Sequence, residues 1–499
     1  MEGLKMKNKK YLMEYIGTVI FLLFGYIVMY LNRRNVELSS SLQEQIFSRY
    51  FTPVALGLSY VLIYYCFAKK TGAHFNPAVS FAYFLNGKLK GKEFLGYCIA
   101  QFLGSLTVFM CLKKIFKILD WEYTYKRNVA ISDLSNIIGI HKLLMAALIE
   151  LILSFILIMI FLSVSEAKNK YSGIIIGLGI MITHIVSNEY AFSGMNPARA
   201  IVGIIYDVTL EEPVYLKYIM EQSIFIVVPF IGAFIAVLLH EVLKSKAMAE
   251  FIGTAIYMFM AIEIALQWFD RLQNISSKDW YGYRNGMEMF YILLVAFAFG
   301  ISFIVMHYSF GRISGGHFNP ITSLVLCIDK QIGKIQCLKY VIAQIFGAIC
   351  GTGIVYVIRY VLGRKDIFTI IDDGRVSFEY AMVANNLVNI NGHVLGGLLA
   401  EIFMGFVIVL VILVFGKKDK DYIGFIIGMT YIILHIFGIP YTLASMNPAR
   451  SIGSAVVGAF AGANKAIEEL WIFILGPLVG ALLAVLIYKI LFAKEDCEE

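Results

Sequence analysis

The chain has 499 residues, of which 59% are hydrophobic and only 15% are charged. An ordinary soluble domain carries about a quarter charged residues, so this composition lacks the polar surface that water requires and favours a membrane protein. Its 42 Lys and Arg exceed its 35 Asp and Glu by seven, but the charges are spread through short loops without a basic block, which argues against nucleic-acid binding.

Twelve apolar runs are long enough to cross a ~30 Å hydrocarbon core as helices. The first run follows the lysine-rich stretch MEGLKMKNKK, but no small-residue cleavage site comes after it, so we predict a retained helix and not a signal peptide. In chain order the runs cover residues 11–31, 51–68, 94–112, 143–164, 171–187, 221–241, 247–268, 287–308, 336–362, 393–415, 421–437 and 467–492.

The two halves of the chain repeat each other. Four uncommon motifs recur in the same order: GluTyrIleGlyThr at 14–18 as GluPheIleGlyThr at 250–254, HisPheAsnPro at 74–77 and 317–320, Ala-Gln followed by Gly at 100–104 and 343–347, and MetAsnProAlaArg at 195–199 and 446–450. This predicts two units, 1–245 and 246–499, joined by the short segment from Leu243 to Met248. Each unit holds three spans in each half, an odd number, so its second half must enter the membrane inverted.

Short Asn-Pro segments lie between the second and third and between the fifth and sixth spans of each unit. Pro fits the first turn of a helix, so Asn76-Pro77, Asn196-Pro197, Asn319-Pro320 and Asn447-Pro448 predict helix starts. The helices that follow are too short to span, and such half-helices are tolerated only inside protein or beside a water-filled cavity. Inverted halves would bring two helix starts, with their positive dipole ends, to the same place at the midplane.

This arrangement resembles the aquaporin family, the major intrinsic proteins, whose paired Asn-Pro-Ala boxes meet at the centre of a narrow pore. The resemblance implies an all-α membrane protein of two aquaporin-like units, each with six transmembrane helices, two re-entrant half-helices and its own pore. The box residues are then Asn76, Pro77, Ala78, Asn196, Pro197, Ala198, Asn319, Pro320, Ile321, Asn447, Pro448 and Ala449. Ile321 departs from the family's Ala, and we expect it to push the half-helices of the second unit slightly apart.

Arg199 and Arg450 follow their box Asn by three residues, and His184 and His435 precede it by twelve. A charged residue inside a membrane is expensive and therefore points to function, although an Arg can also snorkel to an interface and a lone His is often a satisfied core residue. Recurrence at the same offsets favours the functional interpretation. The resemblance implies a narrow selectivity filter formed by Leu56, His184, Ser193 and Arg199 in unit one and by Phe299, His435, Ala444 and Arg450 in unit two.

The filter composition is similar to that of water-selective members, with Leu56 making the first filter the wider one. The family also implies that four buried glutamates accept hydrogen bonds from the re-entrant loops; here these are Glu14, Glu150, Glu250 and Glu401. The alternative for these glutamates is proton coupling in a transporter.

The leading expectation is a passive water channel with two separate pores that exclude ions and protons. The alternatives are a channel for glycerol, hydrogen peroxide or ammonia, a 12-span secondary transporter, and a junction-forming membrane protein whose long loop would be residues 120–141. No catalytic constellation is visible, so we do not expect an enzyme. We also expect no cofactor and no metal, and the odd number of cysteines, seven, argues against a disulfide framework.

The expected partners are water as permeant, the lipid bilayer, and a second copy of the chain. Because the family implies four units around one axis, two chains would form a homodimer that is a pseudo-tetramer of four pores. The resemblance and the lysines before residue 11 place both termini in the cytoplasm. The sequon at Asn274 lies in an expected outer loop, and the membrane is expected to be the plasma membrane or an intracellular vacuolar membrane.

Overall fold

The computed structural model describes residues 2–38, 42–118, 140–167, 169–188, 190, 194–201, 205, 216–273, 280–361, 385, 393–418, 421–460 and 465–492. Within these ranges every regular element is a helix, which confirms the predicted all-α class. The chain divides into two compact units, Met1–Val242 and Leu243–Glu499. Residues 120–139 of the expected loop 120–141, the sequon at Asn274 and the filter position Ser193 lie outside the described residues, whereas residues 140 and 141 are helical.

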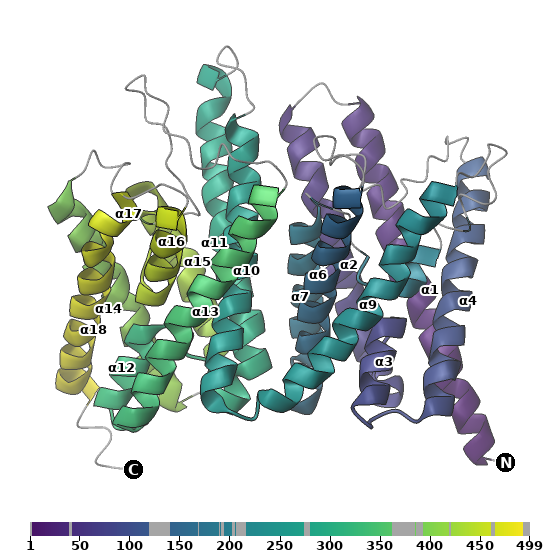
Figure 1. Ribbon diagram of the computed structural model, residues 1–499, viewed down its shortest axis with the longest axis horizontal. Helices are drawn as coiled ribbons and strands as arrows, with labels where there is room; N and C mark the ends of the chain where they lie inside the picture. Colours follow the sequence, from purple (N-terminus) through teal and green to yellow (C-terminus); the bar gives the residue numbers. More distant parts are fainter. Residues whose placement is uncertain are drawn as a thin grey trace. The chain divides into compact units, whose positions relative to one another are not determined.

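The first unit consists of long helices that pack in pairs around a short one (Figure 1). Its helices are α1 (Glu2–Leu38), α2 (Leu42–Thr71), α3 (Pro77–Leu85), α4 (Gly91–Ile118), α6 (Ile140–Ala167), α7 (Ser172–Ser187) and α9 (Leu216–Val242). Helix α1 packs against α2 and α4, α6 packs against α7 and α9, and α2 contacts α7. The short helix α3 lies against α4, α6 and α9.

The second unit repeats this pattern of contacts. Its helices are α10 (Lys246–Gln273), α11 (Trp280–Ser314), α12 (Pro320–Ile328), α13 (Lys334–Val361), α14 (Val394–Lys418), α15 (Ile423–Thr442), α16 (Pro448–Phe460), α17 (Lys465–Glu468) and α18 (Leu470–Phe492). Helix α10 packs against α11 and α13, α14 packs against α15 and α18, and α11 contacts α15. The sequence repeat is therefore also a repeat of packing.

Eleven of the described helices are long and apolar enough to cross a membrane, and α7 is a shorter apolar helix of 16 residues. Their outward faces are apolar too. On α4, Leu95, Ile99 and Leu103 are exposed at a spacing of four residues, which aligns them along one face of the helix. Such a stripe is unfavourable in water and matches a helix that faces lipid.

Three helices that begin at Asn-Pro are too short to span a membrane. Helices α3 and α12 have 9 residues each and α16 has 13. At 1.5 Å per residue these lengths are about 14 and 20 Å, well below the ~30 Å of a hydrocarbon core. Figure 1 shows α12 and α16 in opposite halves of the height of their unit. Of the fourth such segment, in the first unit, residues 197–201 are helical.

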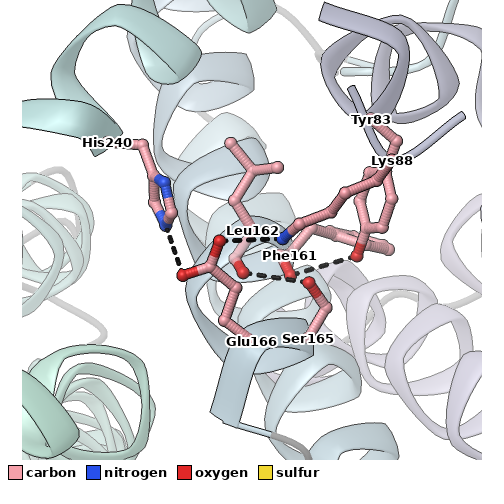
Figure 2. A network of polar contacts seen from close by, with 7 residues as sticks. All are labelled: Tyr83, Lys88, Phe161, Leu162, Ser165, Glu166 and His240. Atoms are coloured by element: carbon pink, nitrogen blue, oxygen red, sulfur yellow. Dashed lines mark hydrogen bonds and ion pairs between the residues drawn. The ribbon is translucent and has the colours of Figure 1, made fainter. Parts of the chain in front are cut away.

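The C-terminal end of α3 is fastened to the two helices beside it by polar contacts (Figure 2). Lys88 Nζ lies 2.8 Å from Glu166 Oε1 of α6, and His240 Nε2 of α9 lies 3.6 Å from Glu166 Oε2. The hydroxyl of Tyr83 donates to the carbonyl of Phe161 at 3.3 Å. Glu166 is 43% exposed, so this ion pair contributes little energy and mainly orients the end of the half-helix.

Glycines allow the closest helix pairs to approach. A Cβ on Gly232 of α9 would lie 3.0 Å from the backbone nitrogen of Phe155 on α6. The equivalent contact in the second unit is tighter, because a Cβ on Gly480 of α18 would lie 2.1 Å from the carbonyl oxygen of Ile402 on α14. Backbone atoms cannot move aside as a flexible side chain can, so this pair of helices requires glycine at position 480.

We predict that Gly480→Ala destabilises the second unit by about 1–3 kcal/mol, the cost of overpacking a tight contact. The measurement is the melting temperature of the detergent-solubilised protein, followed by circular dichroism. The matched control is Gly353→Ala on α13, where an added Cβ meets nothing within 4 Å. Equal melting temperatures for the two variants would contradict the required close approach of α14 and α18.

Candidate functional site

Each box asparagine caps the half-helix that it begins. Asn76 and Asn319 have extended backbones, with φ of −154° and −153°, and their side-chain oxygens accept from the backbone nitrogens of Ala78 at 2.9 Å and Ile321 at 3.1 Å. The other two boxes use the same cap, at 3.0 Å in both. The oxygen of each side-chain amide thus accepts from a free N–H in the first turn of its own helix. The NH2 group of the same amide points away from that helix.

The NH2 groups of the two boxes in each unit bind across to the opposite loop. Asn76 Nδ2 donates to the carbonyl of Met195 at 2.7 Å, and Asn196 Nδ2 donates to the carbonyl of Phe75 at 3.0 Å. Both acceptors are the residues that directly precede the opposite asparagine. This crossed pair of hydrogen bonds holds two helix N-termini together in the middle of the first unit.

The second unit has the same crossed pair. Asn319 Nδ2 donates to the carbonyl of Met446 at 2.9 Å, and Asn447 Nδ2 donates to the carbonyl of Phe318 at 2.8 Å. Ile321 is fully buried. Compared with the first unit, the bond from the first box asparagine is longer, at 2.9 Å against 2.7 Å, and the bond from the second is shorter, at 2.8 Å against 3.0 Å.

The crossed bonds depend on an unusual backbone conformation immediately before each box. The preceding residues are all in the left-handed region, with φ of 47° at Phe75, 46° at Met195, 46° at Phe318 and 54° at Met446. For bulky residues this conformation costs about 1–3 kcal/mol each and persists only where the surroundings hold it. It turns each carbonyl towards the asparagine of the other box.

The buried glutamates hold these strained loops. Glu14 of α1 accepts from the backbone nitrogens of His74 at 3.1 Å and Phe75 at 2.8 Å. Glu150 of α6 accepts from Met195 N at 2.9 Å. All four glutamates are completely buried, and each binds the nitrogen of the left-handed residue before a box.

In the second unit Glu250 of α10 accepts from His317 N at 2.9 Å and from Phe318 N at 2.8 Å. Glu401 of α14 accepts from Ser445 N at 2.9 Å and from Met446 N at 3.0 Å. The carboxyl oxygens of all four glutamates therefore accept hydrogen bonds from backbone nitrogens of the re-entrant loops.

A glutamine and a serine extend two of the glutamate sites. Gln101 Nε2 donates to Glu14 Oε2 at 2.9 Å and to Ser80 Oγ at 3.0 Å, and His74 Nδ1 lies 3.1 Å from the same Ser80 oxygen. The corresponding contacts of Gln344 in the second unit are 2.8 and 2.9 Å. Both glutamines belong to the recurring Ala-Gln motif, which was recognised in the sequence as a repeat but was not assigned this role.

In the first unit the predicted filter residues His184 and Arg199 lie side by side. Arg199 Nη1 is 3.2 Å from His184 Nε2, and the other ring nitrogen of His184 is 2.8 Å from the carbonyl oxygen of Ile180. His184 also lines a cavity, together with Ile180 and both box asparagines. About 20 Å³ of it is open to the centre of a water molecule, which is room for one or two waters.

In the second unit three predicted filter residues meet. The rings of Phe299 and His435 stack with centroids 4.4 Å apart, and the guanidinium carbon of Arg450 lies 5.0 Å from the Phe299 ring. His435 Nε2 and Arg450 Nε are buried, and neither has a hydrogen-bond partner among the described residues. Buried polar atoms of this kind cost about 1–3 kcal/mol each unless water reaches them.

Two further predicted filter residues, Leu56 and Ala444, are also buried. Leu56 is buried on α2, close to Gly25 of α1. Ala444 is fully buried in the turn before the fourth box, in a left-handed conformation with φ of 50°.

Sequence reasoning missed the residue that fixes Arg450. Asn385 accepts a hydrogen bond from Arg450 Nη1 and another from Ser451 Oγ at 2.6 Å, and it donates to the carbonyl of Thr442 at 2.8 Å. Arg450 Nη2 also donates to the carbonyl of Leu443 at 2.9 Å. Asn385 lies far along the sequence from any recurring motif, so no local pattern could have identified it.

The second unit also contains an unpredicted buried ion pair. Arg359 of α13 lies 2.7 Å from Glu263 of α10, and both side chains are completely buried. The pair joins α10 and α13, which also approach closely at Gly351, where an added Cβ would lie 2.2 Å from the carbonyl oxygen of Ala255. Among the described residues no three His, Cys, Asp or Glu side chains gather in a way that would hold a metal ion.

The chain is similar to known proteins of one family. The sequence model of the major intrinsic protein family matches residues 4–240 and again residues 241–488. Aquaporin-4 of Mus musculus is 34% identical over 50% of this chain and 67% of its own length. Glycerol uptake facilitator protein-like 6 of Lactiplantibacillus plantarum is 30% identical over 50% of this chain and 99% of its own length. A solved aquaglyceroporin from Plasmodium falciparum aligns at 18% identity with a TM-score of 0.40, over 49% of this chain and 94% of that one.

We predict that Glu250→Gln lowers the melting temperature. The carboxyl group of Glu250 accepts from Ser314, His317, Phe318 and Gln344, whereas glutamine would turn an NH2 group towards some of these donors. Each buried donor left without a partner costs about 1–3 kcal/mol.

The control for this variant is Glu93→Gln, which removes a partly exposed pair with Lys10 at 3.6 Å and should change stability little. Thermal unfolding of both purified variants in the same detergent is the measurement. If the two curves coincide, the loop does not depend on the carboxyl group of Glu250.

Proposed function

The chain belongs to the major intrinsic protein family, and from that premise we propose that its two units are separate passive water channels that exclude ions and protons. Proteins of this family are transmembrane channels and not enzymes, and the apolar helices make this chain a multi-pass membrane protein. The finer statement, that the permeant is water, rests on the polar groups in the middle of each unit.

The observation that supports water most strongly is the crossed pair of amides in the first unit. Each NH2 group gives one N–H to the opposite carbonyl, at 2.7 Å from Asn76 and 3.0 Å from Asn196, and each has a second N–H available to the cavity that both residues line. Two donors and two helix N-termini at one point favour water molecules whose oxygens face inward. Water oriented outward from the midplane in both directions cannot form a continuous donor chain, so protons are excluded.

The filter pair supports exclusion of ions. Arg199 is buried beside His184, and a fixed positive charge in a region of low dielectric repels cations, including hydronium. Both side chains also occupy space that a larger solute would need. The first filter nevertheless has Leu56 where the second has the aromatic Phe299, and this difference favours glycerol as the second candidate permeant, through unit one.

The test is osmotic swelling and shrinking of vesicles that contain the purified protein. We expect water flow several-fold faster than in empty vesicles, without proton entry detected by an internal pH dye and with slow glycerol entry. Substantial proton conductance would contradict the proposed role of the boxes, and glycerol flow as easy as water flow would favour the second candidate.

A variant of the filter sharpens this comparison. Arg199→Val removes both the charge and much of the side-chain volume, so we expect glycerol entry to increase. The control is Arg312→Val, at an exposed position near the end of α11. An unchanged ratio of glycerol to water flow in Arg199→Val would remove Arg199 from the constriction.

We also propose that two chains assemble into a homodimer with four units around one axis, and that both termini lie in the cytoplasm. The family resemblance supports this assembly, because it implies four units around one axis and one chain supplies two of them. A two-fold axis would then complete the ring.

Native mass spectrometry of the detergent-solubilised protein measures this directly. We expect particles of two chains. Particles of four chains, or single chains that persist at all concentrations, would contradict the pseudo-tetramer.

A further inference from the structure

The two units differ one helical turn before the filter histidine. In the first unit Ile180 precedes His184 by four residues, and in the second Tyr431 precedes His435 by four. Both positions lie on the helix that carries the filter histidine, α7 or α15, and the side chain of Ile180 lines the cavity beside the box asparagines. A tyrosine at the equivalent position carries a larger side chain and a hydroxyl group into this region.

The hydroxyl of Tyr431 accepts a hydrogen bond from the Asn319 amide, which is the donor that a water molecule would otherwise use. Asn319 Nδ2 donates to this hydroxyl at 3.0 Å and to the carbonyl of Met446 at 2.9 Å, so both of its N–H groups are taken. In the first unit the corresponding Asn76 Nδ2 donates to the carbonyl of Met195 and faces a cavity with room for water. The isoleucine of that unit has no polar group to compete for the amide.

The ring of Tyr431 is held in this position from several sides. Its centroid lies 5.0 Å from that of Phe303, 6.1 Å from that of His435 and 6.5 Å from that of Tyr257. Tyr431 is 1% exposed. His435 in turn stacks on Phe299, and Arg450 lies over the Phe299 ring. Successive ring contacts therefore connect the filter residues to the tyrosine that binds the box asparagine.

We propose that Tyr431 closes the second unit at the level of its box, so that the first unit carries most of the water flow of the chain. The proposal rests on the proposed function as a water channel. A water molecule at Asn319 must displace a hydroxyl that already makes an equivalent hydrogen bond, and it must also displace a packed ring, whereas a water at Asn76 displaces neither. Tyr431 is thus the residue that distinguishes the two pathways of one chain.

The experiment exchanges the two residues. Tyr431→Ile gives the second unit the residue of the first, and we expect osmotic water flow per chain to rise, up to about twofold if both units then conduct equally. Ile180→Tyr gives the first unit the residue of the second, and most of the flow should disappear. The double exchange should restore flow close to that of the unaltered chain, now through unit two.

The matched control is Tyr441→Ile, the same substitution at an exposed position of the same helix. It should leave water flow unchanged. Each variant is compared at equal protein per vesicle, after size-exclusion chromatography and thermal unfolding have established that it is folded. Should Tyr431→Ile not fold, Ile180→Tyr tests the same idea in the other unit.

The outcomes separate this inference from the proposed function. If the unaltered chain conducts water but Tyr431→Ile does not increase the flow, or Ile180→Tyr does not reduce it, the closing role of Tyr431 is wrong and water conduction stands. If the unaltered chain and Tyr431→Ile both leave vesicles as impermeable as empty ones, water conduction itself is wrong and the inference fails with it.

Discussion

Backbone N–H groups inside a membrane must find partners within the protein, and in this chain four buried glutamates supply them. Each re-entrant loop leaves the regular helix pattern before its box, so its nitrogens lack the partners that a continuous helix would provide. Glu14, Glu150, Glu250 and Glu401 each bind the nitrogen of a residue whose backbone is left-handed. Without these bonds nothing would offset the strain of the left-handed turn. The carbonyls that accept from the crossed amides would then point elsewhere.

The crossed amides then separate what must stay the same in the two units from what can change. Each amide oxygen caps a helix and each NH2 group binds the opposite loop, with bond lengths between 2.7 and 3.1 Å in both units. The path of each re-entrant loop is held by a glutamate and by the crossed amides. The other side chains around the loop can therefore differ between the two units. The replacement of Ala by Ile321 leaves the crossed bonds intact, and the filter is free to carry Leu56 in one unit and Phe299 in the other.

The sequence predicted the parts of the structure that depend on local pattern and repetition. The Asn-Pro helix starts and the order of the long helices follow from local patterns that recur at similar spacing. The role of the four glutamates was implied only by the resemblance to the family. The ion pair of Glu263 and Arg359, the contacts of Asn385 and the bond from Asn319 to Tyr431 join residues about 65 to 110 positions apart. Glu263, Arg359, Asn385 and Tyr431 belong to none of the motifs that recur in both units, so only the folded structure shows these contacts.

A difference such as Ile180 in one unit and Tyr431 in the other can arise in a chain that carries two units. It cannot arise in a chain that carries a single unit. When identical single-unit chains assemble, any substitution beside the box appears in every pathway, and a tyrosine that closes one closes all. Joining two units in one chain fixes their ratio at one to one and lets each sequence change alone. The bonds of Glu14, Asn76, Glu250 and Asn319 each join residues of a single unit, so a substitution in one unit leaves the corresponding bonds of the other in place. Tyr431 can therefore bind Asn319 in the second unit while Ile180 lines a cavity beside Asn76 in the first, with the crossed amides intact in both.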